Sequence, residues 1–159
     1  VFIPTFKSPQ KNNSTNIKDR LAMLRMGVIS NPNFEISQLE IQRGGTSYAI
    51  DTIREYKSDQ DCASRELFYL IGSDSLKTFH TWKEPREILD ECQVIVALRP
   101  GFIPNDISNW ILRKIQFASI PRFEIGSSTI RSRWRENKTI RYMVTQPVWE
   151  YINEHGIYK

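Results

Sequence analysis

Two continuous apolar runs stand out in the pattern of hydrophobic and polar positions along the chain. Residues 67–71 read LFYLI and end at Gly72, and residues 94–98 read VIVAL and end at Arg99-Pro100-Gly101. Runs of this length bounded by turn residues are typical of strands buried on both faces of a parallel sheet. Further strands are predicted over residues 34–39, from their alternating pattern, over 115–118, and at 1–4, as the end of a buried strand.

Helical periodicity fills much of the chain between these runs. Apolar residues recur at helical spacing from Ile17 to Val28, and Ser14 or Thr15 is the predicted N-cap. Further helices are predicted over residues 47–57 after Gly44-Gly45 with Ser47 as N-cap, 84–91 with Pro85 in the first turn, 106–114, from Ser128 onward, and from Pro147 to Gly156.

Strands that alternate with helices predict an α/β fold with right-handed crossovers, a mainly parallel sheet and flanking helices. A length of 159 residues fits one domain, residues 1–159. Ligands of such folds bind outside the carboxyl ends of the strands, so the loops after each strand are the places to look for chemistry. The chain has no initiator methionine, and Val1-Phe2-Ile3-Pro4 runs straight from a strand into a loop, so we expect an N-terminally truncated sequence.

The charge balance favours anionic partners only mildly. The chain has 22 basic and 18 acidic residues and a pI near 9.1. The densest basic group is Arg131, Arg133 and Arg135, which does not indicate a nucleic-acid tail.

Cysteine and histidine usage excludes several kinds of site. Cys62 and Cys92 lack CxxC spacing, which argues against zinc and disulfide frameworks and fits a reducing cytoplasm. His80 and His155 have no second ligand at metal spacing, so no transition-metal site is predicted. The longest purely apolar run, residues 94–98, is too short to cross a bilayer, so we expect a soluble protein that binds no membrane.

Four segments at predicted strand ends carry candidate chemistry. The first, Gly126-Ser127-Ser128-Thr129-Ile130-Arg131, opens a helix with free N–H groups, hydroxyls and a guanidinium, which suits a phosphate chain. Ordinary N-capping is the alternative interpretation.

The second segment is Gly72-Ser73-Asp74, followed by Trp82. A glycine at a strand end allows close ligand approach, an acidic side chain there can accept hydrogen bonds from ribose or a base, and tryptophan can stack on a flat ring. A helix cap and a packed tryptophan are the alternatives.

The third and fourth segments offer anion-binding groups. Residues 44–52 deliver backbone amides to a helix N-terminus, where they could hold a carboxylate or phosphate, or simply cap the helix. Arg99-Pro100-Gly101 holds a cation at a strand end, where it could neutralise phosphate or merely end the strand.

These segments occur in an order that resembles bacterial nicotinate mononucleotide adenylyltransferases. The likeness spans essentially the whole chain and includes Pro9-Gln10-Lys11 and the closing residues 148–158. The resemblance implies a Rossmann-like nucleotidyltransferase fold. It also implies transfer of AMP from ATP to nicotinate mononucleotide, giving nicotinate adenine dinucleotide and pyrophosphate in NAD biosynthesis, with Mg²⁺ as the expected ion.

The resemblance also implies roles for particular residues. For ATP these are Ser127, Ser128, Thr129 and Arg131 at the phosphates, Gly72 and Asp74 at the adenosine, and Arg99. For the nicotinate nucleotide they are Trp82, stacked on the pyridine ring, with backbone amides near Tyr48 and Ala49 and at Lys83. Arg131 and Lys11, near phosphate, are the candidates for a catalytic contribution.

Two departures from the family pattern bear on these expectations. The family's His-x-Gly-His segment, with its first strand and helix, does not appear before Val1, so the fragment is expected to be impaired in turnover and folding. Ala49 stands where the family usually has threonine, which keeps a backbone amide but removes a hydroxyl.

The transfer needs no protein nucleophile, because the acceptor phosphate can attack ATP in line and the protein contributes positioning and charge neutralisation. Two alternatives stay open. One is a relative of the same superfamily that uses nicotinamide mononucleotide or phosphopantetheine, and the other is a non-catalytic basic module for RNA or an acidic protein. ATP and nicotinate mononucleotide are the expected partners, nucleic acid is not, and a homo-oligomer is left open.

Overall fold

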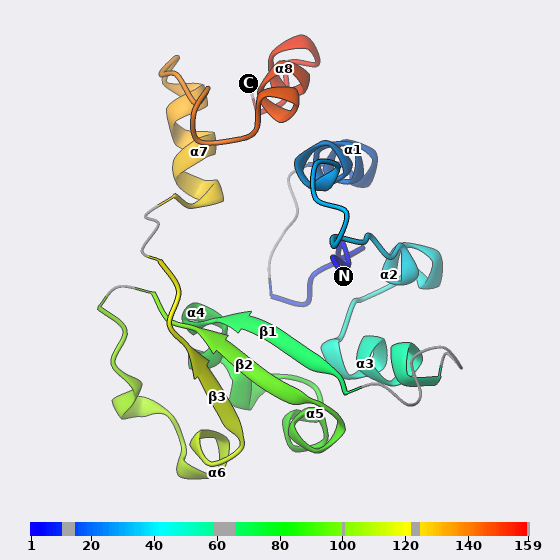
Figure 1. The fold of residues 1–159 in the computed structure, drawn as a ribbon, viewed down its shortest axis with the longest axis vertical. Helices are drawn as coiled ribbons and strands as arrows, with labels where there is room; N and C mark the ends of the chain where they lie inside the picture. The colour runs from blue at the N-terminus through cyan, green and yellow to red at the C-terminus, as the bar shows by residue number, and fades with distance from the viewer. Residues whose placement is uncertain (11–14, 59–65, 100, 122–124, 159) are drawn as a thin grey trace. The chain divides into compact units, whose positions relative to one another are not determined.

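The computed structural model describes residues 1–10, 15–58, 66–99, 101–121 and 125–158. The chain divides into two compact units, which are described separately below. Unit 1 comprises Val1–Ser47 and Phe123–Lys159, and unit 2 comprises Tyr48–Arg122. Figure 1 shows the elements of both units along the chain.

Unit 2 contains a three-stranded parallel sheet in the order β1-β2-β3. Its strands are β1 (Phe68–Gly72), β2 (Gln93–Ala97) and β3 (Ile115–Ala118). The register places Gly72 beside Ala97 and Ala97 beside Ala118, so the strands end at a common carboxyl edge. The prediction of three parallel strands in these segments is confirmed.

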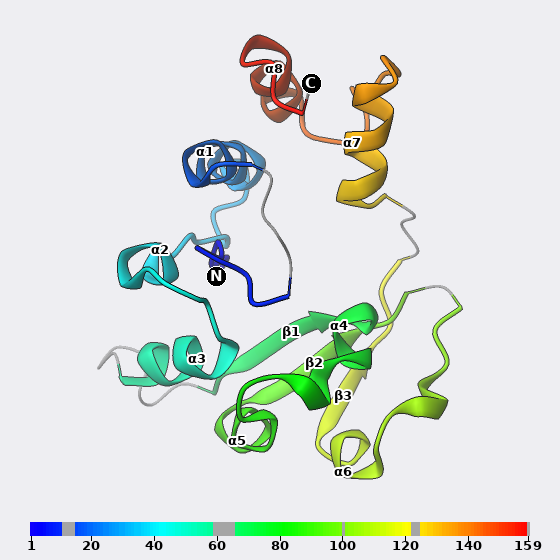
Figure 2. The same cartoon turned by 180° about the vertical axis from the view of Figure 1, so that it is seen from behind.

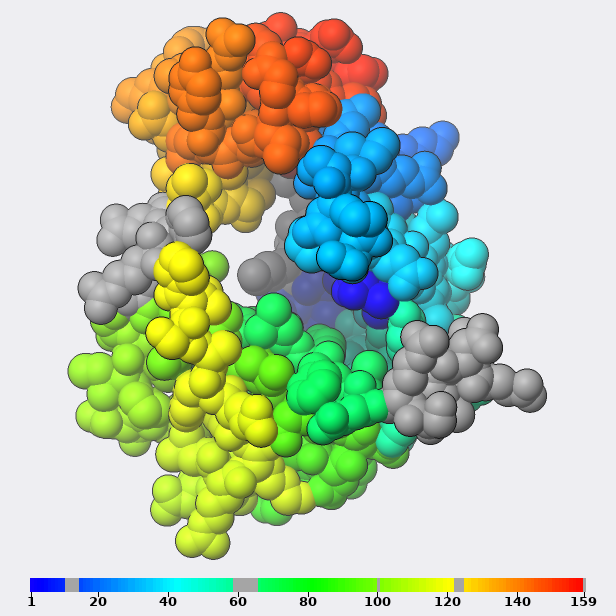
Figure 3. All heavy atoms as spheres, viewed as in Figure 1, coloured from blue at the N-terminus to red at the C-terminus, as the bar shows by residue number. Residues whose placement is uncertain are grey.

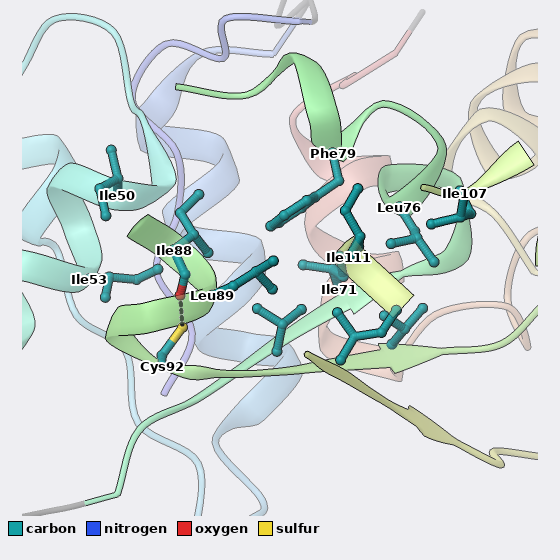
Figure 4. Packing of buried hydrophobic residues seen from close by; sticks show 13 residues of the cluster. Ile50, Ile53, Ile71, Leu76, Phe79, Ile88, Leu89, Cys92, Ile107 and Ile111 are labelled. Carbon is teal, nitrogen blue, oxygen red and sulfur yellow. Dashed lines mark hydrogen bonds between the residues drawn. The ribbon is translucent and has the colours of Figure 1, made fainter. Parts of the chain in front are cut away.

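Helices cover one face of this sheet, as the two opposite views in Figures 1 and 2 show. They are α3 (Ala49–Ser58), α4 (Ser73–Lys77), α5 (Pro85–Glu91) and α6 (Asn109–Leu112), with two 3-10 turns, η1 (Phe79–Thr81) and η2 (Pro104–Asp106). Apolar side chains from this layer and from the covered sheet face form one core. Figure 4 shows Phe79 in its middle, between α3 and α5 on one side and Leu76 and Ile107 on the other.

The other face of the sheet is open within unit 2. Phe68 and Leu70 of β1 are 51% and 67% exposed, and Figure 3 shows side chains of the strands, green to yellow, at the surface on this side. The prediction that β1 is buried on both faces is therefore wrong for this unit. The physical reason is that the helices pack on one face only, so alternate strand residues have no covering layer.

Unit 1 is built from α1 (Ile17–Val28), α2 (Leu39–Arg43), α7 (Ser127–Arg135) and α8 (Gln146–Glu154). Helix α1 contacts α8, and the Tyr151 hydroxyl donates to Asp19 Oδ1 at 2.9 Å. Buried Ile140, Ile152 and Ile157 form the centre of a second core. The first and last segments of the unit therefore pack together although they are far apart in the sequence.

Two strands predicted in unit 1 are each reduced to one isolated bridge. Phe2 pairs in parallel with Ile36, while the Phe2 N–H donates to the Glu35 carbonyl at 2.7 Å. The alternating pattern of residues 34–39 is cut short because α2 begins at Leu39. Val1 is 57% exposed, so residues 1–4 are not a buried strand within the described chain.

Helix boundaries differ from the sequence expectations mainly at the caps. Asn16 caps α1, its Oδ1 accepting from the Asp19 N–H at 2.9 Å; Thr15 does not, and Ser14 lies outside the described residues. Ser47 does not cap α3, which begins at Ala49. The Ser47 hydroxyl instead accepts from the Phe6 N–H at 3.1 Å and ties down the N-terminal loop.

The remaining helices agree more closely with the pattern. Pro85 and Pro147 lie in the first turns of α5 and α8, as predicted. The helix predicted over residues 106–114 is shorter, because a 3-10 turn precedes α6. Helices α2 and α4, each of five residues, were not predicted. In the part of the chain described here, no helix has the length and apolar character that crossing a membrane requires.

The first core makes a direct prediction about stability. Ile88 is fully buried, so Ile88→Ala should lower the free energy of unfolding by about 2 to 5 kcal/mol through lost burial and a residual cavity. Ile103 is 66% exposed, and Ile103→Ala is the matched control, with an expected change below about 0.5 kcal/mol. Chemical denaturation of both variants measures the difference, and equal losses would contradict the assignment of the core.

Cys92 should react slowly with alkylating reagents. Burial raises the pKa of its thiol to about 11; Lys57 opposes the rise and Glu91 adds to it. The thiol donates to the Ile88 carbonyl at 3.3 Å (Figure 4). Since only the thiolate is nucleophilic, roughly 0.1% of the thiol is reactive at pH 8. Iodoacetamide labelling of a Cys62→Ser variant should be slow when folded and fast in denaturant, and fast labelling of the folded chain would contradict this environment.

Candidate active site

The carboxyl ends of β1 and β2 bring together three residues predicted to bind ATP. Gly72 ends β1, Asp74 lies in the first turn of α4, and Arg99 follows β2. Arg99 Nη1 lies 2.7 Å from Asp74 Oδ2, and both side chains are more than 60% exposed. A side chain placed at Gly72 would meet nothing within 4 Å, so the space beside this strand end is open. The pair can therefore meet a ligand from solvent.

Ser73 connects the same two strand ends through a hydrogen bond of its side chain, a role that the sequence did not indicate. Its side chain is fully buried, and its hydroxyl accepts from the Arg99 N–H at 3.2 Å. The bond fixes the backbone of Arg99 next to the residue preceding Asp74. A small polar residue between two candidate ligand residues was the only available signal, since its partner lies 26 positions away.

A second cluster in unit 2 contains residues predicted to bind the nicotinate nucleotide. Lys83 Nζ lies 2.7 and 2.9 Å from the two carboxylate oxygens of Asp51, and 5.1 Å from the centre of the Tyr48 ring. The start of α3 and the turn after η1 thus meet at this point. The structure thus places Lys83 against Tyr48, with Ala49 next to Tyr48 in the chain. The binding roles of these residues stay predictions.

Backbone donors are uncommitted in this second cluster. Within the described residues, the N–H groups of Tyr48, Ala49 and Lys83 donate to no acceptor. The first N–H groups of a helix have no partner inside the helix, and they lie at its positive end. These amides can therefore serve a negatively charged group.

Trp82 is half-buried at the rim of the core. Its ring lies 5.2 Å from the ring of Phe79, tilted by 41°, and 6.4 Å from that of Tyr69 in an edge-on arrangement. Its indole Nε1 is buried and has no hydrogen-bond partner in the described part of the chain. Packing thus accounts for one side of the indole, as the alternative interpretation held. Stacking on a ligand stays a prediction.

The third cluster lies in unit 1, at the start of α7. Gly126 is the N-cap residue and has no side chain to offer, and no side chain caps the helix among the described residues. Ordinary N-capping therefore does not account for the hydroxyls of Ser127, Ser128 and Thr129 there. The guanidinium of Arg131 lies 6.0 Å from the Tyr158 ring centre. Hydroxyls and amides share this helix end, and Arg131 follows Ser127 by four residues in the same helix, which is the composition of a phosphate site.

Some predicted site residues are not placed. Lys11 and Pro100 lie outside the described residues. The first two clusters belong to unit 2 and the third to unit 1, so the expectation that all of them face one pocket stays a prediction.

Known proteins resemble this chain in sequence along its whole length. The family model described as cytidylyltransferase-like matches residues 1–133. A protein of Desulfitobacterium hafniense named "Probable nicotinate-nucleotide adenylyltransferase" is 35% identical over 168 aligned positions, covering 100% of this chain and 80% of the relative. A protein of Thermomicrobium roseum with the same name is 36% identical, covering 100% of this chain and 77% of the relative.

A solved structure of similar fold comes from Plasmodium falciparum. It is the nicotinic acid mononucleotide adenylyltransferase complexed with NaAD, with a TM-score of 0.74 and 19% identity over 98% of this chain and 80% of that one. This likeness confirms the expected Rossmann-like nucleotidyltransferase fold. With sequence relatives aligned along its whole length, the chain belongs to the nicotinate-nucleotide adenylyltransferase family of cytidylyltransferase-like proteins.

Proposed function

We propose that this protein transfers AMP from ATP to nicotinate mononucleotide, releasing pyrophosphate and forming nicotinate adenine dinucleotide for NAD biosynthesis. The observation that carries the proposal is the alignment of the entire chain with enzymes of this name at about a third identity. The Plasmodium relatives of similar fold are described as complexes with NaAD and with APC. Three clusters of hydrogen-bond donors and charged side chains in this chain suit the two substrates.

The donor nucleotide is assigned to two clusters. Ser127, Ser128, Thr129 and Arg131 at the start of α7 would hold the ATP phosphates through amides, hydroxyls and a guanidinium. Gly72 and Asp74 would lie on the adenosine side. Arg99 can bind phosphate without leaving Asp74, because a guanidinium carries five N–H donors and the ion pair uses only part of them.

The acceptor nucleotide is assigned to the cluster at the start of α3. The amides of Tyr48, Ala49 and Lys83 would donate to the nicotinate carboxylate. The exposed part of the Trp82 ring would stack on the pyridine ring. The hydroxyl that threonine would supply is missing at Ala49, so recognition at that position depends on the backbone.

The reaction follows from positioning of the two nucleotides. An oxygen of the acceptor 5′-phosphate attacks the α-phosphorus of ATP, a new P–O bond forms, and the bond to pyrophosphate breaks on the opposite side. Negative charge grows on the leaving pyrophosphate, and Arg131 with the α7 amides would stabilise it there. Lys11 is assigned to the phosphates from the family resemblance alone.

Mg²⁺ is proposed to enter with ATP. Within the described residues, no three His, Cys, Asp or Glu side chains gather as a metal-binding group. Mg²⁺ in phosphoryl-transfer sites is commonly bound by substrate phosphates and water with only one or two carboxylates, so the polar groups at the strand ends fit such a complex. The ion supplies charge neutralisation at the phosphates when it is bound.

Pyrophosphate release tests the proposed reaction and the choice of acceptor. The protein as its gene encodes it should release pyrophosphate from ATP and Mg²⁺ with nicotinate mononucleotide, and at least about 10-fold less efficiently with nicotinamide mononucleotide. The carboxamide NH₂ would face N–H donors, which cannot accept its hydrogens. A preference for nicotinamide mononucleotide or phosphopantetheine would contradict the acceptor assignment, and ATP-independent binding to RNA would contradict the enzyme.

Arg131→Ala tests the assignment of the ATP phosphates to α7. Loss of the guanidinium should cost about 2 to 4 kcal/mol of transition-state stabilisation, measured as the fall in kcat/KM for ATP. Arg135→Ala is the matched control, because Arg135 lies in the last turn of the same helix, away from its positive end. Equal effects of the two substitutions would contradict a phosphate site at the start of α7.

A further inference from the structure

Two ion pairs connect α3 to the turn that carries the acceptor residues. Asp51 of α3 pairs with Lys83 at 2.7 Å, and Arg54 of α3 pairs with Glu84 at 2.8 Å. Asp51 and Arg54 are three residues apart and therefore share one face of the helix. Lys83 and Glu84 are consecutive, so two adjacent residues of the turn are each attached to the same helix. These two pairs are called the clasp below.

The backbone of Glu84 is held in an unfavourable conformation. Its φ is +50° with ψ +57°, in the left-handed region that glycine adopts readily and other residues rarely do. The next residue is Pro85, which further restricts the residue before it to extended conformations. The surrounding structure holds Glu84 in this conformation, and the ion pair with Arg54 is one of the contacts that its side chain makes there.

The clasp joins the two elements that carry the acceptor donors. The N–H of Lys83 is in the clasped turn, while the N–H groups of Tyr48 and Ala49 are at the start of the clasping helix. The Lys83 ammonium also packs over the Tyr48 ring at 5.1 Å. Any change in the position of the turn against α3 changes the separation between the two sets of amides.

We propose that the clasp is a specificity device, in which Asp51, Arg54 and Glu84 are positioning residues for the acceptor carboxylate. This inference rests on the proposed function. Both oxygens of a carboxylate accept hydrogen bonds, so two sets of amides held at a fixed separation can donate to it together. The NH₂ group of a carboxamide is itself a donor and needs acceptors, which these amides do not provide. By fixing that separation, the clasp favours a nicotinate over a nicotinamide ring.

The clasp contributes little to the stability of the fold. Its four side chains are 32% to 44% exposed, and exposed ion pairs contribute little because water and salt screen them. Variants that lose one pair should therefore fold, and their defects should appear in acceptor binding. The midpoint of thermal unfolding is measured for each variant to establish this.

The first test removes acidic residues from the clasp. Asp51→Asn and Glu84→Gln should each raise the KM for nicotinate mononucleotide about 10-fold and lower its preference over nicotinamide mononucleotide, with the KM for ATP within about 2-fold of the parent. Simple electrostatics predicts the opposite sign, since removing a negative charge near an anionic substrate should tighten binding. A lowered or unchanged KM would overturn the proposal.

The second test is a double-mutant cycle on Arg54 and Glu84. Arg54→Gln, Glu84→Gln and the double variant should raise the acceptor KM by similar factors, because all three lose the pair between Arg54 and Glu84. Arg54 also lies 3.9 Å from Glu91, so Glu84→Gln is the variant that removes this pair alone. If the changes in acceptor KM of the two single variants add up in the double variant, the ion pair is not their cause and the proposal is overturned. Asp90→Asn is the matched control: it breaks the exposed pair between Asp90 and Lys114 in the same unit and should leave both KM values unchanged.

Two outcomes distinguish loss of the proposed activity from loss of the role of the clasp. A parent protein that releases no pyrophosphate with any acceptor would overturn the proposed function and the clasp with it. A parent that prefers nicotinate mononucleotide, with clasp variants that keep this preference, would overturn the clasp alone.

Discussion

The burial of one face of the β1-β2-β3 sheet under α3 to α6 is the constraint from which the rest of unit 2 follows. Val94 and Val96 of the central strand are fully buried against this layer, which fixes the register of the strands on each side. The register in turn places the end of β1 beside the end of β2. Asp74 and Arg99 meet because those ends coincide, and the buried hydroxyl of Ser73 locks the second strand end against the first.

The proposed reaction depends on backbone N–H donors that make no hydrogen bond within the described part of the protein. The start of α3, the turn after Trp82 and the start of α7 each present N–H groups with no acceptor in the described chain. Such groups cost free energy when they are shielded from water without a partner, so they remain at the surface, where an anionic ligand can reach them. An enzyme that brings two anionic nucleotides together needs this arrangement more than it needs a nucleophile.

The central elements of the fold could be predicted from the sequence, because apolar runs bounded by turn residues mark strands and helical periodicity marks helices. The exposed side chains of Phe68 and Leu70 show that such a run need not be buried on both faces. The β2 and β3 segments and the prolines of α5 and α8 are examples. Short elements could not: α2 and α4 have five residues each, too few for a period to appear. The alternation of residues 34–39 did predict a strand, but one bridge is all that forms before α2 begins.

Part of the candidate site could also be predicted from the sequence, and part could not. Residues that follow strands, such as Asp74 and Arg99, could be found because topology brings strand ends together. The pairs Asp51–Lys83 and Arg54–Glu84 could not, since their partners lie 30 or more positions apart and no local pattern marks them. The positive φ of Glu84 could not be predicted either, because glutamate rarely adopts this conformation. Tertiary contacts alone reveal these features.

The uncapped start of α7 has a consequence for the free protein. A Ser, Thr, Asp or Asn in place of Gly126 would stabilise the helix end by only a few tenths of a kcal/mol, and its side chain would occupy the amides that a phosphate needs. The protein therefore leaves that end without a side-chain cap. Under the proposed function, a phosphate of the substrate would take the place of the missing cap and stabilise the helix that binds it.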